Sequence, residues 1–257
     1  MAVSARRRLI GLARPRGPDL SLGDPPGRSV TRETAWAVVA AGGRGVRMGR
    51  KKPGIVVAGR PLLCWTLDKF EAIADLDGIV VVVPPEDVPA WRRRLRDRGR
   101  VRAVVGGGAE RQESVRRGLE AVPPEAEWIV VHDGVRPCVT PELVHRVLTA
   151  AREHGAAIAA LPVAETLKRG VGEWVKETVD RHGLWAVQTP QAFRAALLRE
   201  AHRRAGAGGI LATDDAALVE CMGVPVRLVP GLPGNVKITR PADLALARLL
   251  LRGRKLG

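Results

Sequence analysis

The sequence predicts an α/β fold: a single-domain, Rossmann-like, mostly parallel sheet with helices on both faces. From Trp36 onward, short runs of β-branched residues alternate with amphipathic helical stretches, the pattern of strand–helix–strand crossover units. The chain has 257 residues, of which 46% are hydrophobic. That is enough for one sizeable core, and α/β domains of about 200 to 250 residues commonly fold as one unit. We therefore expect one folded domain over residues 35–257.

Each predicted strand is a short apolar run that stops at or near a glycine, a proline or an acidic residue. In chain order, the expected strands are 36–40, 78–83, 101–105, 128–132, 156–161 and 225–229. Helices are predicted where apolar residues recur three and four positions apart, in several cases after a proline or an acidic residue. The expected helices are 61–74, 87–98, 110–122, 141–154, 193–205, 213–222 and 241–251.

One segment breaks this alternation. Residues 163–188 contain β-branched residues that favour an extended hairpin, with Gly170 and Gly172 near its tip. A two-stranded hairpin is marginally stable by itself in water. We therefore expect a projecting β-arm that docks on a second subunit and makes the protein a homodimer.

Composition and charge limit the classes of partner. The net charge is +15, but the basic residues are scattered, tyrosine is absent and only two phenylalanines occur, so we expect no nucleic-acid binding. No apolar run approaches the roughly 20 residues that span a bilayer, so no membrane association is expected. Cys64, Cys138 and Cys221 lack metal-ligand spacing and indicate reduced thiols in a cytoplasmic protein. Residues 1–34, rich in arginine, proline and glycine, are predicted to be a disordered basic extension.

A glycine-rich loop follows the first predicted strand. Residues 43–48 read Gly-Arg-Gly-Val-Arg-Met. Glycines let backbone N–H groups approach phosphate oxygens, and Arg47 adds a permanent charge. A Walker loop is excluded, and so is a dinucleotide-binding loop, because Met48 stands where its third glycine would be. The sequence is similar to the loop of nucleotidyltransferases that release pyrophosphate, although an ordinary turn explains the glycines equally well.

Two further segments follow predicted strands, at the sheet edge where parallel sheets bind ligands. Asp133 ends an apolar strand and precedes Arg136, which suits a magnesium–nucleotide or a sugar next to a phosphate, or only a local turn with an ion pair. Gly107 and Gly108 precede Ser114 in a second glycine loop. This loop either fits around a base or only begins a helix.

Two segments near the C-terminal end also carry candidate residues. Lys237 lies between apolar residues before the last predicted helix. There its ammonium group is either aimed inward at a phosphate or solvated. Thr213, Asp214 and Asp215 fit either a metal-binding pair of carboxylates or the cap and first turn of a helix.

These segments and several others occur in the order and spacing of one enzyme family. They are Ala-Gly-Gly-Arg-Gly-Val-Arg-Met (41–48), Gly-Gly-Ala-Glu-Arg-Gln-Glu-Ser-Val (107–115), His-Asp-Gly-Val-Arg-Pro (132–137), Thr-Leu-Lys-Arg (166–169), Thr-Val-Asp-Arg (178–181), Leu-Trp (184–185), Gln-Thr-Pro-Gln (188–191), Thr-Asp-Asp (213–215) and Asn-Val-Lys-Ile-Thr-Arg-Pro (235–241). The chain thus resembles the 2-C-methyl-D-erythritol 4-phosphate cytidylyltransferases over residues 36–251.

The resemblance implies a dimeric enzyme of non-mevalonate isoprenoid synthesis. It joins CTP and methylerythritol phosphate to give the CDP-alcohol and pyrophosphate. The acceptor phosphate attacks the α-phosphorus of CTP in line, which arginine, lysine and magnesium assist by positioning and charge stabilisation. The implied cofactor is Mg²⁺, bound mainly by the CTP phosphates, with Asp133 as the one candidate protein ligand.

The resemblance also implies roles for individual residues. The expected catalytic residues are Arg47, Lys52, Arg181 and Lys237. The expected nucleotide-binding residues are Ala41, Gly42, Gly43, Gly45, Gly107, Gly108, Ser114 and Asp133. The expected substrate-binding residues are Asp133, Arg136, Thr166, Arg181, Thr189, Thr213 and Lys237, of which Thr166 and Arg181 would reach the neighbouring subunit's site.

Two departures from the family pattern keep alternatives open. The family has a proline followed by lysine after the loop arginine, whereas here Gly54 follows Pro53. Alignment on the downstream segment 57–62 places Lys52 in the lysine's position, and this register is preferred. Gly134 and Val135 replace two alanines after the aspartate. The alternatives are therefore a ribitol-phosphate or other polyol-phosphate cytidylyltransferase, and a nucleotide-binding protein with weakened catalysis.

Overall fold

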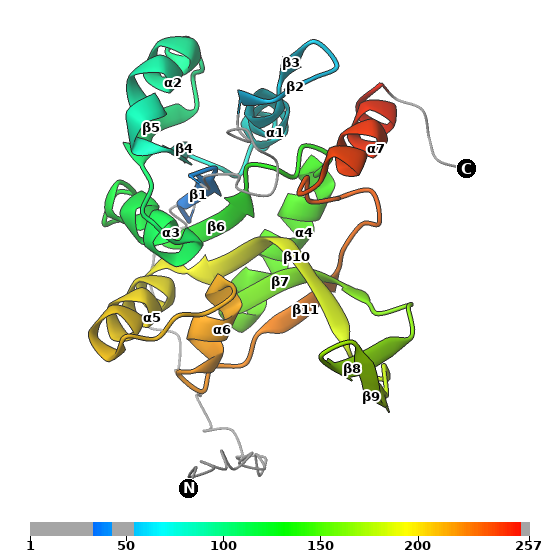
Figure 1. The fold of residues 1–257 in the computed structure, drawn as a ribbon. Coiled ribbons are helices and arrows are strands. Elements are labelled where there is room, and N and C mark those ends of the chain that lie inside the picture. The colour runs from blue at the N-terminus through cyan, green and yellow to red at the C-terminus, as the bar shows by residue number, and fades with distance from the viewer. Residues whose placement is uncertain (1–32, 43–53, 253–257) are drawn as a thin grey trace, which may run out of the picture. The chain divides into compact units, whose positions relative to one another are not determined.

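The computed structural model describes residues 33–42 and 54–252, which belong to one compact unit (Figure 1). The basic extension predicted to be disordered, up to residue 32, lies outside the described residues, as do Gly43, Gly45, Arg47 and Lys52. Within the described ranges, no helix is both long and apolar enough to cross a membrane.

A seven-stranded sheet forms the centre of the fold, with the order β11-β7-β10-β6-β1-β4-β5. Its strands are β1 (Ala35–Ala40), β4 (Gly78–Val83), β5 (Val101–Gly106), β6 (Trp128–Asp133), β7 (Ala156–Pro162), β10 (Trp185–Arg194) and β11 (Arg227–Pro230). Neighbouring strands are parallel, except that β10 runs antiparallel between β6 and β7. The predicted mostly parallel sheet is confirmed.

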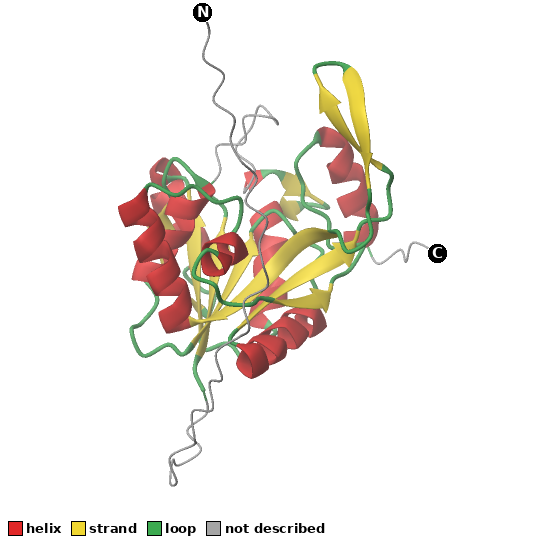
Figure 2. Cartoon of the chain, turned by 90° about the horizontal axis from the view of Figure 1, so that it is seen from below, coloured by secondary structure: helices red, strands yellow, loops and turns green. Residues whose placement is uncertain are grey.

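Helices cover both faces of the sheet (Figure 2). They are α1 (Leu62–Glu71), α2 (Val88–Leu95), α3 (Arg111–Glu120), α4 (Pro141–His154), α5 (Ala195–Gly208), α6 (Asp215–Glu220) and α7 (Pro241–Leu251), with a 3-10 turn, η3, at Pro85–Asp87. Side chains alternate along each strand. Ala37 and Val39 of β1 therefore pack with α1, α2 and α4, whereas Val38 packs with α3, α5 and α6. A third cluster joins α7 to the hairpin of β2 (Val56–Val57) and β3 (Arg60–Pro61).

Helix α4 shows why local signals placed most helices well. Thr140 caps it, since its side chain accepts a hydrogen bond from the Leu143 N–H, and Pro141 occupies the first turn, where its missing N–H costs nothing. Gly155 ends the helix with a φ of 85°, a conformation that other residues adopt with strain. The observed bounds are those predicted.

Strand β10 corrects the prediction of a helix from Phe193. Phe193 is a fully buried residue of β10, and α5 begins only at Ala195. Pro190, which cannot donate a ladder hydrogen bond, argues against an interior strand. The structure accommodates it at an irregularity in the β10–β7 register between Val187 and Gln191. The pairing with β6 and β7 therefore overrides the local signal. The last predicted strand also begins later, at Arg227.

The strands β8 (Leu167–Val171) and β9 (Trp174–Val179) form a separate two-stranded sheet within the segment predicted to be a hairpin. Its turn contains Gly172, with a φ of 58°. The hairpin stands away from the central sheet (Figures 1 and 2). Docking of this segment on a second subunit stays a prediction.

Close packing of α3 on the sheet depends on Gly118. A Cβ at this position would lie 2.5 Å from Cγ1 of Val38 and 2.9 Å from Cγ2 of Val82. Both valines are fully buried in the centre of the sheet. Since α3 begins directly after the second glycine loop, this contact sets how closely that loop approaches the sheet edge.

We expect Gly118→Ala to destabilise the fold by about 1–3 kcal/mol, because the added methyl group must displace buried valines. Gly206→Ala is the matched control. Gly206 is an exposed residue of α5 with no heavy atom within 4 Å of an added Cβ, so alanine there should stabilise by about 0.5–1 kcal/mol. Urea unfolding of both variants measures the effects, and equal shifts of the same sign would contradict this account of Gly118.

Candidate active site

The carboxyl ends of β1 and β6 and the loop after β5 meet at one edge of the sheet. Because β1 and β6 are parallel and Ala40 pairs with Asp133, the chain leaves β1 beside that carboxylate. The loop after β5 approaches from the other side. A Cβ on Gly42 would lie 3.3 Å from the Cα of Gly107. Gly42, directly before the first glycine loop, therefore lies against the backbone of the second glycine loop, as expected of an edge that binds a ligand.

Ser114 orders the second glycine loop. Its hydroxyl donates to the Glu110 carbonyl oxygen at 3.0 Å and accepts from the Gly108 N–H at 3.1 Å. A Cβ on Gly107 would lie 2.7 Å from the same hydroxyl oxygen, so Gly107 is needed for this close approach. A hydroxyl accepts two hydrogen bonds, which leaves Ser114 one acceptor position for a ligand.

Two cavities open at this edge. The glycine-loop cavity is lined, among others, by five of the predicted nucleotide-binding residues: Ala41, Gly42, Gly108, Ser114 and Asp133. The β10 cavity is lined, among others, by five of the predicted substrate-binding residues: Asp133, Arg136, Thr189, Thr213 and Lys237. Gly107 is in neither set. The two cavities have Arg111, Asp133 and Lys237 in common, so these three residues form the shared wall.

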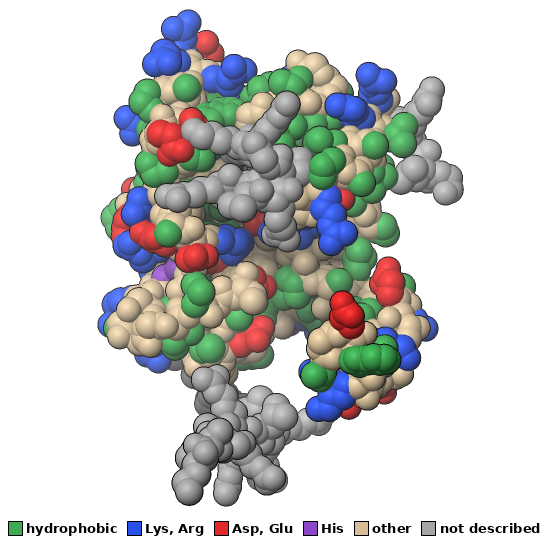
Figure 3. All heavy atoms as spheres, viewed as in Figure 1, with side chains coloured by type: hydrophobic (Ala, Val, Ile, Leu, Met, Phe, Trp, Pro, Cys, Tyr) green, Lys and Arg blue, Asp and Glu red, His purple; other side chains and the backbone are tan. Residues whose placement is uncertain are grey.

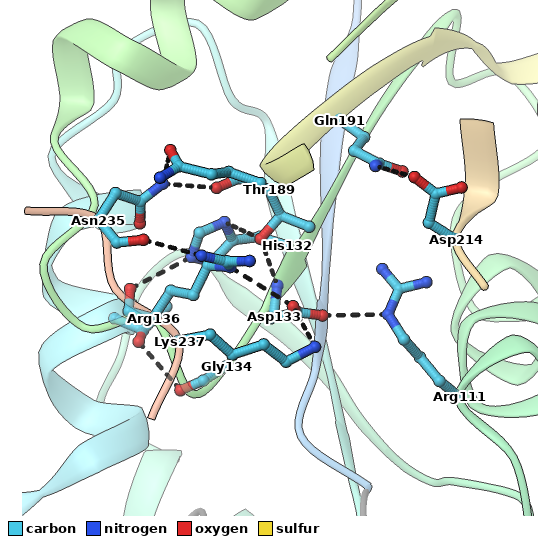
Figure 4. A network of polar contacts seen from close by, with 12 residues as sticks. Arg111, His132, Asp133, Gly134, Arg136, Thr189, Gln191, Asp214, Asn235 and Lys237 are labelled. Atoms are coloured by element: carbon cyan, nitrogen blue, oxygen red, sulfur yellow. Dashed lines mark hydrogen bonds and ion pairs between the residues drawn. The ribbon is translucent and has the colours of Figure 1, made fainter. Parts of the chain in front are cut away.

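The carboxylate of Asp133 lies among three cations (Figure 4). Its Oδ1 accepts from Nε of Arg111 at 3.0 Å, and its Oδ2 lies 2.9 Å from Nζ of Lys237 and 3.5 Å from Nε of Arg136. Burial raises the pKa of Asp133, but Arg111, and then Lys237 and Arg136, outweigh it and hold the pKa well below its usual range. Asp133 is therefore ionised, and the four residues form what we call the Asp133 cluster.

A chain of hydrogen bonds holds Asp133 from behind. Its backbone N–H donates to Oγ1 of Thr189 at 3.0 Å, and that hydroxyl lies 3.0 Å from Nδ1 of His132. Burial lowers the pKa of His132 to about 3, so its ring is neutral. The other ring nitrogen, Nε2, lies 3.3 Å from the Arg136 carbonyl oxygen. The consistent assignment is that Thr189 donates to Nδ1 and that Nε2–H donates to Arg136. Thr189 thus positions the cluster as well as lining the β10 cavity.

Arg136 is largely buried, with 8% of its surface exposed. Its guanidinium donates to the Asn235 carbonyl oxygen at 2.8 Å, and Asn235 donates in turn to the Thr189 carbonyl oxygen at 2.8 Å. Burial lowers the pKa of Arg136, and Asp133 opposes that shift. These contacts tie the segment before α7 to β10, so Lys237 reaches the cluster from a fixed backbone.

Arg111 was not among the predicted site residues, although it lies in one of the matching segments. It is the first residue of α3 and donates from Nη1 to Asp215 at 2.8 Å, in addition to its bond with Asp133. Burial lowers the pKa of Arg111, but the two carboxylates outweigh it and raise the pKa above its usual value. Its Nη2 is buried and has no hydrogen-bond partner among the described residues. The sequence signal that could have identified Arg111 is its position, as a cationic residue at the start of a predicted helix directly after a glycine loop.

The carboxylates of Asp214 and Asp215 serve different partners, which corrects the reading of this pair as metal ligands. Asp214 caps α6 by accepting from the Ala217 N–H at 3.0 Å, and it also accepts from Gln191 at 2.7 Å. Asp215, 1% exposed, pairs with Arg111 and accepts from Nε2 of His202 at 3.0 Å. The alternative prediction, that these residues form the cap and first turn of a helix, is confirmed for α6.

Thr166 and Arg181 lie outside both cavities. Thr166 is exposed, and Arg181, also exposed, donates to the Ala164 carbonyl oxygen. Both belong to the segment around the β8–β9 hairpin, so this chain does not bring them to its own Asp133 cluster. Their predicted contribution to a neighbouring subunit's site stays a prediction.

The residues of this edge fit a protein-held magnesium ion poorly. No group of three or more His, Cys, Asp or Glu side chains suited to a metal occurs in the ranges 33–42 and 54–252. Asp133 was the candidate ligand, but both of its oxygens already contact cationic side chains. A metal ion bound to Asp133 would have to displace one of these side chains.

Comparisons with known proteins agree with this geometry. The family described as 2-C-methyl-D-erythritol 4-phosphate cytidylyltransferase matches residues 35–253. A protein of that name from Synechococcus sp. (strain WH7803) is 44% identical over 84% of this chain and 99% of its own length. The one from Geobacillus kaustophilus is 45% identical, over 85% of this chain and 97% of its own length.

Solved structures of this family share the fold. The crystal structure of the Thermus thermophilus enzyme of the same name has a TM-score of 0.73 and 42% identity, covering 86% of this chain and 99% of that one. A 4-diphosphocytidyl-2C-methyl-D-erythritol synthase from Anaerococcus prevotii has a TM-score of 0.76 and 32% identity, over 86% and 96%. The chain belongs to the 2-C-methyl-D-erythritol 4-phosphate cytidylyltransferase family of nucleotidyltransferases.

Proposed function

We propose that the protein transfers the cytidylyl group of CTP to 2-C-methyl-D-erythritol 4-phosphate, giving 4-diphosphocytidyl-2-C-methyl-D-erythritol and pyrophosphate. CTP occupies the glycine-loop cavity, and the alcohol phosphate occupies the β10 cavity. One observation carries this assignment: the two cavities share the wall of Arg111, Asp133 and Lys237. Two anionic substrates bound on either side of this wall bring their phosphates together beside two cations.

The reaction requires charge stabilisation and positioning. A phosphate oxygen of the acceptor attacks the α-phosphorus of CTP, a new P–O bond forms, and the bond to the pyrophosphate leaving group breaks. Lys237, 40% exposed, and Arg111, with Nη2 lacking a partner among the described residues, supply cationic donors at the wall. Cations fixed in advance lower the barrier because they need no reorganisation as charge develops. Asp133 holds both cations in place, and Arg136 extends the positive field into the β10 cavity.

We assign the remaining cations of the triphosphate site to Arg47 and Lys52, which lie outside the described residues. Magnesium enters as part of the substrate, as the metal complex of CTP, because the described residues offer it no ligand set. We also propose the cytoplasm as the place of action. Cys64, Cys138 and Cys221 are all unpaired, as is usual in a reducing compartment.

The first test is pyrophosphate release from CTP and Mg²⁺ with methylerythritol phosphate, with ribitol phosphate, or with no acceptor. Release with methylerythritol phosphate alone is expected, because the acceptor phosphate is the nucleophile and the β10 cavity must also fit its polyol. Faster turnover of ribitol phosphate would assign the polyol alternative. Folded protein that binds CTP but turns over none of these acceptors would show a nucleotide-binding protein with weakened catalysis.

The assignment of substrates to cavities predicts opposite effects of two substitutions. Ser114→Ala should raise KM for CTP about five- to tenfold, because the Gly108 N–H loses its partner, while KM for the alcohol phosphate changes little. Thr213→Val should raise KM for the alcohol phosphate and leave KM for CTP nearly unchanged, because Thr213 lines the β10 cavity and not the glycine-loop cavity. Steady-state kinetics with each substrate varied in turn separates the two, and an exchange of the two effects would invert the assignment.

We further propose that the protein is a homodimer joined through the β8–β9 hairpin. The hairpin carries Trp174, 82% exposed, and Val171 and Val175, 64% and 65% exposed. Hydrophobic side chains gather there on the surface, at the lower right of Figure 3. Contiguous exposed apolar residues of this size mark an interaction surface. A partner on this surface would also bring Thr166 and Arg181, which flank the hairpin, near a second site.

Light scattering should therefore give the wild type twice the 27.6 kDa mass of one chain. Trp174→Glu places a charge in the proposed interface, so it should shift the protein to the monomer and lower turnover. Leu249→Glu, at an exposed apolar position on α7, is the control and should stay dimeric. A monomeric wild type with full activity would rule out the dimer and the contribution in trans.

A further inference from the structure

We propose that His202 and Asp215 are positioning residues for cytidylyl transfer, which act through Arg111 on the shared wall of the two cavities. This inference rests on the proposed function and adds a layer behind the residues that meet the substrates. The pair lies behind Arg111, on α5 and at the start of α6, and neither residue lines either of the two cavities.

The first step is the orientation of Arg111. Its Nε is held by Asp133 at 3.0 Å and its Nη1 by Asp215 at 2.8 Å. Because a guanidinium is planar, two bonds to separate carboxylates fix the whole group and with it the direction of the third nitrogen. Only Nη2 then has no partner among the described residues. Without Asp215, the group could rotate about its bond to Asp133.

The second step is the orientation of Asp215. Its carboxylate is 1% exposed, with Oδ2 bound to Arg111 and Oδ1 bound to Nε2 of His202 at 3.0 Å. An ionised carboxylate can only accept hydrogen bonds, so the imidazole carries a proton on Nε2. His202 is itself buried in the α5 face. The carboxylate is therefore fixed at both oxygens, and α5, α6 and α3 are joined through polar contacts behind the site.

The third step separates positioning from stability. Desolvation offsets much of the attraction within a buried ion pair, so such a pair contributes little net stability compared with an apolar packing. The pair does, however, fix the orientation of the Arg111 guanidinium. The cluster around Asp133 has three cations for one carboxylate. Asp215 gives Arg111 an anion of its own, so Asp133 can hold Lys237 and Arg136 while Arg111 keeps its place.

The experiment compares His202→Leu with His202→Gln. Glutamine can place an amide N–H close to the position of Nε2, whereas leucine removes the donor. We expect His202→Leu to lower kcat about tenfold or more with KM for CTP nearly unchanged, because a small misplacement of a substrate-positioning group affects the transition state. His202→Gln should restore kcat to within about threefold of the wild type. Asp215→Asn should lower kcat further, by about a hundredfold.

Two controls make the result specific. His145→Leu removes the same kind of pair, His145 with Asp75 at 2.9 Å, at an exposed position, and should leave kcat unchanged.

The effect of His202→Leu is also measured in Arg111→Lys, which cannot make the two-point contact. If His202 acts through Arg111, His202→Leu should lower kcat little further in the Arg111→Lys variant. A purely structural role would lower urea stability of both His202 variants and leave kcat per folded molecule unchanged.

The outcomes are distinct. Wild-type turnover with rescue by glutamine and loss of the effect in Arg111→Lys supports the inference. Two results overturn the inference alone, provided that the wild type turns over. One is an unchanged kcat in His202→Leu, His202→Gln and Asp215→Asn. The other is a loss of kcat on His202→Leu that is as large in the Arg111→Lys background as in the wild type. Absence of turnover by the folded wild type overturns the proposed function and this inference with it.

Discussion

The carboxylate of Asp133 is the anion on which the rest of the site depends. Arg111, Arg136 and Lys237 come from α3, the loop after β6 and the segment before α7, and all three meet at this group. Without an anion among them, three cations at such short range would repel one another. Their meeting therefore requires a residue that stays ionised although it is buried, and the same cations hold its pKa low.

The sheet provides the geometry for this arrangement. Asp133 is the last residue of β6, which is buried along its whole length and lies between β1 and β10, so the neighbouring strands hold its backbone. Strand β10 runs antiparallel beside it and brings Thr189 against both the Asp133 N–H and the neutral ring of His132. The side chain of Thr189 reaches the cluster at the irregular register around Pro190. The strand that was not predicted from the sequence is thus the one that supports the Asp133 cluster from behind.

In the proposed function, the two cavities explain how one cluster would serve two substrates. Each cavity has a different outer lining, glycine backbone on one side and the polar side chains of β10 and the α6 start on the other. Their common wall carries one carboxylate and two cations, which suits a transfer between two phosphates. Under this proposal, binding energy from either substrate would help to place a phosphate at the same position.

Local sequence signals were sufficient for the fold class, for the parallel strands and for helices with clear ends such as α4, where Thr140, Pro141 and Gly155 act on their own neighbourhood. The ordered segments also indicated the family, and they contain most of the residues that line the two cavities. What the sequence could not show depends on partners far along the chain. Strand β10 exists because β6 and β7 pair with it, although Pro190 argues against a strand. Arg111 belongs to the site because Asp133 and Asp215, 22 and 104 residues away, converge on it. Such contacts are set by packing of the whole domain, and no local propensity encodes them.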